Sequence, residues 1–352
     1  MTVAVAIAEP EVAPAATFVP TLWWDFANTA NTAALAKAKT PAKQAKAAGL
    51  DWLVEATDVF TKIVRQPNAI EQVGIGPDWN GGPIEQYILV PGKKAITRTD
   101  TGIPLSIMGG RYSILQNLRM FEFGDALVDS GLKVVGAGEF AGDKVTWVQF
   151  ELPSEIEVHG DPSAVKPYLL LYTSHDGSRP FGALLTFVRV ICKNTFNAAI
   201  KGAADKFIIR HTPNASGRVE EARRVLGLSF SAVETFEKVA LDLSKRPMDN
   251  VKFAEFAEVL VPSPVREGPA TRAAQADENR EMLNDLFTSS PLLDGVDFTY
   301  WRAFNAVTEW VDHHRDYRAS AGNTINDNKA LSLFDGQASE FKGRALEMLR
   351  RN

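Results

Sequence analysis

The stretch of sequence that decides the fold runs from Tyr168 to Ala215 and reads YLLLYTSHDGSRPFGALLTFVRVICKNTFNAAIKGAADKFIIRHTPNA. Two apolar runs in it, at 168–173 and 183–190, are typical of β-strands, and the polar turn SHDGSR joins them. A short helix over 195–204 and a third strand over 206–210 are expected to follow. Polar side chains therefore gather at the ends of predicted strands, where binding residues are often held.

The sequence on either side of this stretch predicts more strands and then mostly helices. The alternation in KVTWVQF, residues 144–150, predicts a strand that forms a hairpin with residues 132–140. Apolar residues at helical spacing predict a helix over 115–130. Turns are expected at Pro91-Gly92 and at residues 99–102. Further helices are expected at 216–244, 275–288, 297–319 and 337–350.

The order of these elements favours the α+β class, because strands and helices come in blocks without regular βαβ alternation. We expect three parts along the chain. Residues 1–28 are rich in Ala, Val, Pro and Glu without a period and are expected to form a disordered tail. Residues 29–250 are expected to form an α+β core domain with an antiparallel sheet, and residues 251–352 a mostly helical C-terminal region.

The composition of the 352 residues is ordinary for a soluble globular protein, with 45% hydrophobic and 23% charged residues. No apolar run approaches the roughly 18 residues that span a bilayer. The N-terminus lacks the basic region of a secretory signal, so a cytoplasmic protein without a membrane partner is expected. The single cysteine, Cys192, excludes an internal disulfide and a cysteine-based zinc site. No signature of a cofactor is present.

The local distribution of charge is more informative about a possible binding surface than the net charge of -5. Between Arg189 and Arg224 the chain has eight Lys/Arg and only three acids. Phosphate contact is a sensible use for such a segment, and a solvated face is the alternative. The candidate phosphate contacts are Arg189, Lys193, Asn194, Lys201, Lys206 and Arg210, with Lys93, Lys94, Arg98 and Arg111 as secondary contacts and Tyr112 as the candidate base-stacking residue.

Two groups of histidines and acids are candidates for other chemistry. His175 and Asp176 in the SHDGSR turn could serve acid–base chemistry, although a turn stabilised by Asp-Gly is the simpler interpretation, and His211 is a further candidate polar residue. On a predicted helix, Glu309 and His313 share a face and could bind a metal with Asp312 or His314. The spacing is not that of the His-Glu-x-x-His zinc motif, and an ordinary buried helix is the alternative.

Several short blocks follow one another along the chain: AGLDW (48–52), VPGK (90–93), RTDTG (98–102), GRY (110–112) with Gln116-Asn117, SHDG (174–177), VRVICKNT (188–195), RHT (210–212) and NAVTEWVDHH (305–314). This ordered series resembles the phage/plasmid-like protein family of unknown function, found in actinobacteria, their phages and plasmids. The resemblance covers roughly residues 45 to 320. Near the N-terminus, where members often carry a Trp-His…Leu-Gly stretch, this chain has Trp23-Trp24-Asp25-Phe26 instead.

The resemblance implies a setting in mobile-element DNA metabolism in a bacterial cell and a distant likeness to phage single-strand annealing proteins. Those proteins have a small curved antiparallel sheet with packed helices, form rings or filaments, and hold single-stranded DNA along a basic groove. The leading hypothesis is therefore a non-enzymatic single-stranded-DNA-binding protein of annealing type that forms a homo-oligomer. A metal-dependent hydrolase or nuclease, and a phage structural or host-interaction protein, are the alternatives.

Overall fold

The computed structural model describes residues 28–29, 32–66, 83–189, 195–196, 206–209, 215–263, 270–320 and 322–351. Within them, an antiparallel seven-stranded sheet has the order β1-β5-β6-β7-β8-β10, with β9 also paired to β8. Its strands are β1 (Asn28–Thr29), β5 (Lys133–Phe140), β6 (Val145–Glu151), β7 (Val165–Ser174), β8 (Gly182–Arg189), β9 (Thr195–Phe196) and β10 (Lys206–Ile208).

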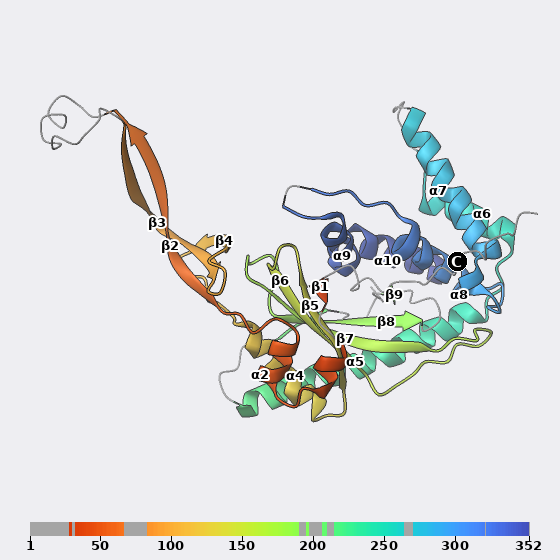
Figure 1. Cartoon of the computed structure of the whole chain (residues 1–352). Coiled ribbons are helices and arrows are strands. Elements are labelled where there is room, and N and C mark those ends of the chain that lie inside the picture. Colours follow the sequence, from red (N-terminus) through yellow and green to blue (C-terminus); the bar gives the residue numbers. More distant parts are fainter. Residues whose placement is uncertain are drawn as a thin grey trace, which may run out of the picture.

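Helices cover both faces of this sheet (Figure 1). On one face, α4 (Asn117–Val128) packs its Gly124 against the Phe150 ring, and Phe236 of α5 (Ala215–Ser244) stacks on Phe187 with 3.9 Å between ring centroids. On the opposite face, the Phe334 ring of α9 (Ile325–Asp335) contacts Tyr172 edge-on. Because both faces are covered, β6, β7 and β8 are buried along most of their length.

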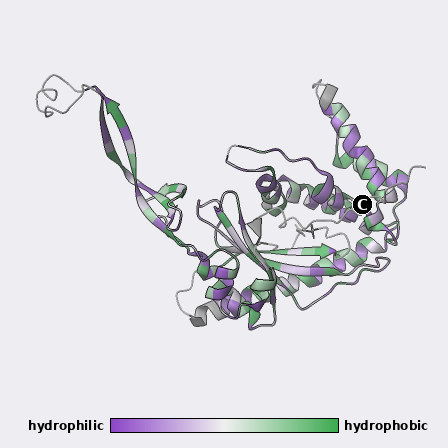
Figure 2. Ribbon diagram, viewed as in Figure 1, coloured by the Kyte–Doolittle hydropathy of each residue, from purple (hydrophilic) through white to green (hydrophobic). Residues whose placement is uncertain are grey.

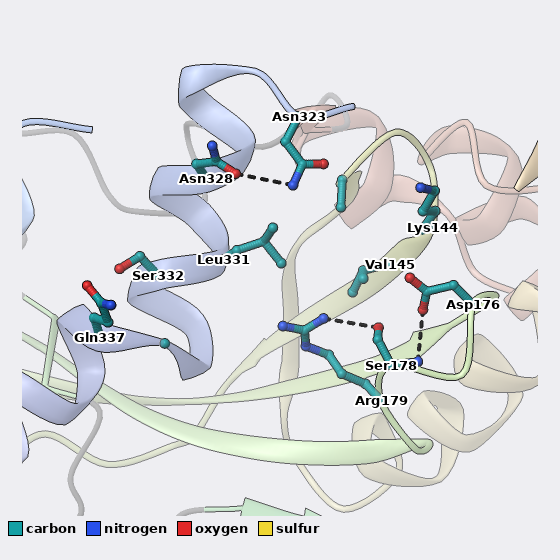
Figure 3. A pocket seen from close by; sticks show the side chains of 12 residues that line it. Lys144, Val145, Asp176, Ser178, Arg179, Asn323, Asn328, Leu331, Ser332 and Gln337 are labelled. Carbon is teal, nitrogen blue, oxygen red and sulfur yellow. Dashed lines mark hydrogen bonds between the residues drawn. The ribbon is translucent and has the colours of Figure 1, made fainter. Parts of the chain in front are cut away.

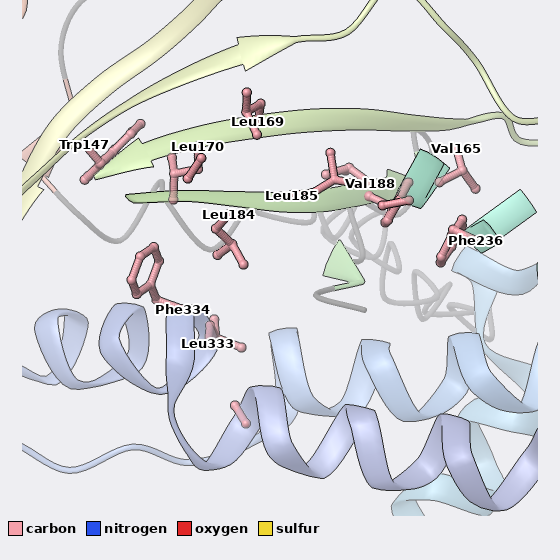
Figure 4. Packing of buried hydrophobic residues seen from close by; sticks show 14 of the residues in the cluster. Trp147, Val165, Leu169, Leu170, Leu184, Leu185, Val188, Phe236, Leu333 and Phe334 are labelled. Carbon is pink, nitrogen blue, oxygen red and sulfur yellow. The ribbon is translucent and has the colours of Figure 1, made fainter. Parts of the chain in front are cut away.

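The core between the sheet and α9 is formed by large apolar side chains (Figure 4). Leu170 and Leu184 come from paired positions of β7 and β8, and Leu333 and Phe334 point toward the sheet from α9. All four side chains are at most 1% exposed. Truncating such a side chain to Ala typically costs about 2–5 kcal/mol, so these contacts hold the helical C-terminal region on the sheet.

A three-stranded sheet, β2-β3-β4, projects from the body as a long arm (Figure 1). It consists of β2 (Val54–Arg65), β3 (Ile84–Arg98) and the shorter β4 (Pro104–Gly109). The prediction of a turn at Pro91-Gly92 is wrong, because β3 continues through these residues. The pairing of β2 with β3 shifts between Asp58 and Phe60, and Gly92 on the facing strand takes φ +68°. Pro91 and Gly92 therefore belong to a bulge inside β3.

The remaining helices pack in two places: those before the arm lie on β5 and α4, and those of the C-terminal region pack mainly on one another. They are α1 (Thr32–Lys37), α2 (Pro41–Ala47), α6 (Asn250–Leu260), α7 (Ala270–Ser289), the 3-10 turn η2 (Pro291–Leu293), α8 (Tyr300–Glu309), the π-helical turn η3 (Trp310–His314) and α10 (Gln337–Arg351). The α+β class and the mostly helical C-terminal region are confirmed. The helix expected over 297–319 is shorter, because α8 passes into η3 and regular helix ends at His314.

Candidate nucleic-acid interface

The base of the arm brings together the secondary contact residues that the sequence predicted. Lys93 on β3 pairs directly with Gly109 on β4, and the Gly110 N–H donates to the Gly92 carbonyl over 2.9 Å. An open cavity of about 530 Å³ lies at this turn and is lined by Gly92, Gly109, Gly110, Arg111 and Tyr112. The glycines leave the backbone uncovered, so a ligand can approach it closely.

The four cations at the arm base differ in what they can still contact. Lys93 and Arg111 are exposed, and in the described part of the chain neither side chain has an ion pair or hydrogen bond. Lys94 pairs with Asp58 over 2.6 Å, but both side chains are exposed and such a pair contributes little. Arg98 is different because its guanidinium donates to Asp100 and Asp143.

Arg98 fastens the arm to the main sheet. Its hydrogen bond to Asp100 is the main reason why its pKa is raised, and Asp143 in the β5–β6 turn adds a second hydrogen bond. Its guanidinium also lies 4.3 Å from the centroid of the Trp52 ring. The exposed charge available at the arm base therefore comes from Lys93, Lys94 and Arg111.

The predicted stacking residue, Tyr112, packs against the SHDGSR turn. Its hydroxyl donates to the Ser174 carbonyl over 3.1 Å, and burial raises its pKa. The ring is half-buried, since it both lines the cavity at the arm base and packs near Gly177. Tyr112 thus fixes the position of the arm base relative to the end of β7.

His175 lies in the interior and joins three elements. Its backbone N–H donates to Lys144 O over 2.7 Å, and its carbonyl accepts from the Ser106 hydroxyl over 2.7 Å. Its Nε2 lies 2.9 Å from Asn117 Oδ1, which also accepts from Thr146, so Nε2 is the protonated nitrogen. The residue is 1% exposed, and burial lowers its pKa to about 4. A neutral, buried imidazole of this kind supports the fold and is not placed for acid–base chemistry on a solvent-borne substrate.

Asp176 lies on the other side of the turn, at a polar cavity of about 660 Å³ between the turn and α9 (Figure 3). Although burial opposes it, hydrogen bonds from Ser178 hold the pKa of Asp176 below its ordinary value. Lys144 and Arg179 also line the cavity, and α9 contributes Asn328 and Ser332. Charges of both signs meet here, so this cavity does not provide a simple phosphate site.

Arg189 occupies a position that the sequence did not suggest. Its guanidinium forms a two-point ion pair with Asp161, with both distances 2.7 Å, and neither side chain is exposed. It also donates to Leu292 O over 2.7 Å. The structure thus contradicts the prediction of a phosphate contact at Arg189, because the charge is buried and already paired.

The other residues of the predicted basic segment cannot be placed. Lys193, Asn194, Lys201, Arg210 and His211 lie outside the residues that the structure describes, and so do residues 1–27 of the predicted tail. Lys206 is described through its backbone alone, as the first residue of β10. The prediction of a helix over 195–204 is wrong at its start, since Thr195 and Phe196 form β9. The rest of that range lies outside the residues that the structure describes.

The acids and histidines of α8 and η3 are engaged inside the helical region. Both carboxylate oxygens of Glu309 accept from the Ser290 hydroxyl, at 2.7 and 2.9 Å, and Asp312 forms a buried ion pair with Lys342. Burial lowers the pKa of His313. Among the described residues, no group of three or more His, Cys, Asp or Glu side chains could hold a metal ion. The described geometry therefore gives the metal hypothesis no support.

The sequence analysis did not predict one link between the sheet and the C-terminal helices. Ala141, Gly142 and Asp143 all have positive φ, between 60° and 64°, and the Ala141 N–H donates to Asp327 Oδ1 over 2.8 Å. Asp327 closes a capping box with Thr324 at the start of α9. The Thr-x-x-Asp spacing was a readable helix-start signal. The β5–β6 turn therefore binds α9 through Ala141 and the arm through Asp143.

Comparison with known families gives one match. The profile of a family described as a domain of unknown function (DUF932) matches residues 104–332, which is more than half of the chain. The chain therefore belongs to this family. Neither the curated proteins nor the solved structures contain a match. Within the described residues, none of the helices has the length and apolar character needed to cross a bilayer.

Proposed function

We propose that the chain is a non-enzymatic single-stranded-DNA-binding protein of annealing type that acts as a homo-oligomer in phage or plasmid recombination or replication. The observation that carries the proposal is the arm base, where the exposed side chains of Lys93 and Arg111 have no partner among the described residues and lie beside an open, glycine-walled cavity. The resemblance to the phage/plasmid-like family and to annealing proteins supports the same class. In this proposal the protein acts in the cytoplasm of a bacterial host.

The mechanism is electrostatic and needs no bond to be broken. Lys93 and Arg111 contact phosphates, and the nearby Lys94 can exchange its exposed partner Asp58 for a phosphate. Tyr112 borders the cavity and offers part of its ring to a base. The bases that are not held there stay exposed for pairing, while repeated weak contacts on neighbouring subunits raise the affinity.

The test is fluorescence anisotropy of a labelled single strand and its duplex over a salt series, with and without magnesium. The double variant Lys93→Glu/Arg111→Glu should weaken single-strand binding about tenfold or more. It should also reduce the slope of log affinity against log salt by about 1.4, since each phosphate contact on a single strand contributes about 0.7. Lys238→Glu/Lys245→Glu makes the same change in net charge at exposed positions on or just after α5 and is the matched control.

Each other outcome contradicts the proposal in a different way. Equal loss in the control pair would show that only net charge matters and would remove the arm base as the site. No binding of the parent protein at low salt would favour a structural or host-interaction role. Cleavage of the oligonucleotide with magnesium would favour the hydrolase.

A further inference from the structure

The outer part of the arm carries an apolar surface that is exposed in the part of the chain that the structure describes. Phe60 pairs directly with Leu89, Lys62 with Tyr87, and Val64 with Glu85, so these side chains share one face of the β2–β3 ribbon. The four apolar members, Phe60, Val64, Tyr87 and Leu89, are between 48% and 63% exposed and are called the arm stripe below. Figure 2 shows hydrophobic colour along this projecting ribbon.

Such a surface needs a partner. A two-stranded ribbon is only marginally stable in water when nothing packs on its faces. Contiguous exposed apolar residues on a soluble protein usually mark an interaction site. The charges on the stripe face are also balanced, because Lys62 pairs with Glu85 over 2.6 Å. A neutral apolar ribbon suits a protein surface better than a polyanion.

The opposite end of the same molecule offers a surface of matching chemistry. A groove of about 400 Å³ between α6 and α10 is lined by Met248, Phe256, Val259 and Met348, with Lys252 and Glu255 among its other lining residues. Val259 is 69% exposed. Methionines adapt to irregular partners, and one lysine with one glutamate can answer Glu85 and Lys62 of an incoming arm. This surface is called the groove below.

We propose that the arm stripe of one chain packs into the groove of a second copy. The arm and α6 lie at opposite ends of the molecule in Figure 1, so the contact joins different chains. The stripe and the groove are different surfaces, and a head-to-tail contact of this kind builds a ring if it closes and a filament if it does not. The inference deepens the proposed homo-oligomer and does not depend on DNA binding.

Two variants remove one half of the contact each, and each has a control. Phe60→Thr/Leu89→Thr takes the apolar side chains from the arm stripe but keeps strand-forming residues. Ile107→Thr, at a residue 61% exposed on β4, is its control. Val259→Glu places a charge in the groove. Val251→Glu, at a residue equally exposed on the same helix but not lining the groove, is its control. Circular dichroism melts verify that each variant is folded.

The readout is molar mass by light scattering and sedimentation velocity without DNA. The parent and both controls should assemble, while the arm variant and the groove variant should each be monomeric. An equimolar mixture of the two deficient variants should form dimers and nothing larger, because only one intact contact is left. This mixing result distinguishes a head-to-tail contact from an arm-to-arm contact.

Three results would overturn the proposal: a monomeric parent at tens of micromolar, a Val259→Glu protein that assembles like the parent, or a mixture that stays monomeric. Since mass is measured without DNA, a failed assembly is distinguishable from a failed nucleic-acid interface. A parent that assembles but does not bind DNA would leave this contact in place and remove only the proposed function.

Discussion

Replacing Arg189 should destabilise the junction between the sheet and the C-terminal helices and leave DNA binding by the folded protein unchanged. The guanidinium contacts both oxygens of Asp161 and the carbonyl of Leu292, and Trp301 Nε1 donates to the same carboxylate over 2.8 Å. The ion pair therefore connects β8, the loop that holds Asp161, η2 and α8. Both side chains of the pair are fully buried.

The magnitude follows from burial. Removing one partner of a buried ion pair costs about 3–5 kcal/mol, because the remaining charge stays desolvated without compensation. With a shift of about 2 °C per kcal/mol for a chain of this size, Arg189→Met should lower the melting temperature by about 6–10 °C. The additional change Asp161→Asn removes the stranded charge and keeps an acceptor for Trp301, so the double variant should recover more than half of the loss.

Thermal and urea unfolding followed by tryptophan fluorescence measure the effect. The same substitution at Arg223, which is exposed on α5, should stay within about 0.5 kcal/mol of the parent. A melting temperature of Arg189→Met within 2 °C of the parent would refute the reasoning. Weaker DNA binding at an unchanged melting temperature would return Arg189 to the nucleic-acid interface.

Two further predictions concern the core around α4 and the SHDGSR turn. Burial lowers the pKa of His175 from 6.5 to about 4. Its contribution to the free energy of unfolding is therefore complete above pH 6.5, and up to about 3 kcal/mol of it is lost as the pH falls toward 4. His175→Gln should flatten this dependence in urea midpoints between pH 7 and 4.5, and parallel profiles would contradict the assignment. Gly124→Ala should destabilise the protein by about 1–3 kcal/mol, because the added Cβ would lie 2.5 Å from the Phe150 ring. Gly227→Ala, where no atom lies within 4 Å of the added Cβ, should stabilise α5 by about 0.5–1 kcal/mol. Equal effects at the two glycines, measured by thermal unfolding, would show that the ring moves aside.

The sequence predicted the elements whose signal is local. Alternation around Trp147 gave the β5–β6 hairpin, and the apolar runs around the SHDGSR turn gave β7 and β8. The long helix expected at 216–244 is α5. The prediction at Pro91-Gly92 failed because the dipeptide that favours a turn also fits a bulge, and only the partner strand distinguishes the two.

The predictions that failed at the site depend on contacts between distant segments. Arg189 looks like a solvated cation in the sequence, yet its partner Asp161 lies 28 residues earlier in a loop. His175 looks like a candidate acid–base group in the sequence. Its burial depends on Trp52, just before β2, and on Asn117 of α4. Lys93 and Arg111 were named from the sequence as secondary phosphate contacts, and the structure pairs Lys93 with Gly109, two residues before Arg111. Their role in binding stays a prediction.

Two apolar runs of this chain lie in opposite environments, one in the core and one at the surface. Leu169, Leu170 and Leu171 are fully buried, whereas Tyr87, Ile88 and Leu89 are 41–63% exposed. The exposed run lies on β3 only a few residues from Lys93, so the proposed subunit contact and the proposed phosphate contact share one strand. DNA bound at the arm base would then lie beside the neighbouring subunit, and binding should be cooperative along the strand.

Val259→Glu separates the two contributions, because it changes the groove and leaves the arm base intact. This variant should bind a single strand with a non-cooperative isotherm and lower apparent affinity, while Val251→Glu should keep the cooperative isotherm of the parent. A Val259→Glu protein that is monomeric yet binds with undiminished cooperativity would show that assembly on DNA uses a different surface.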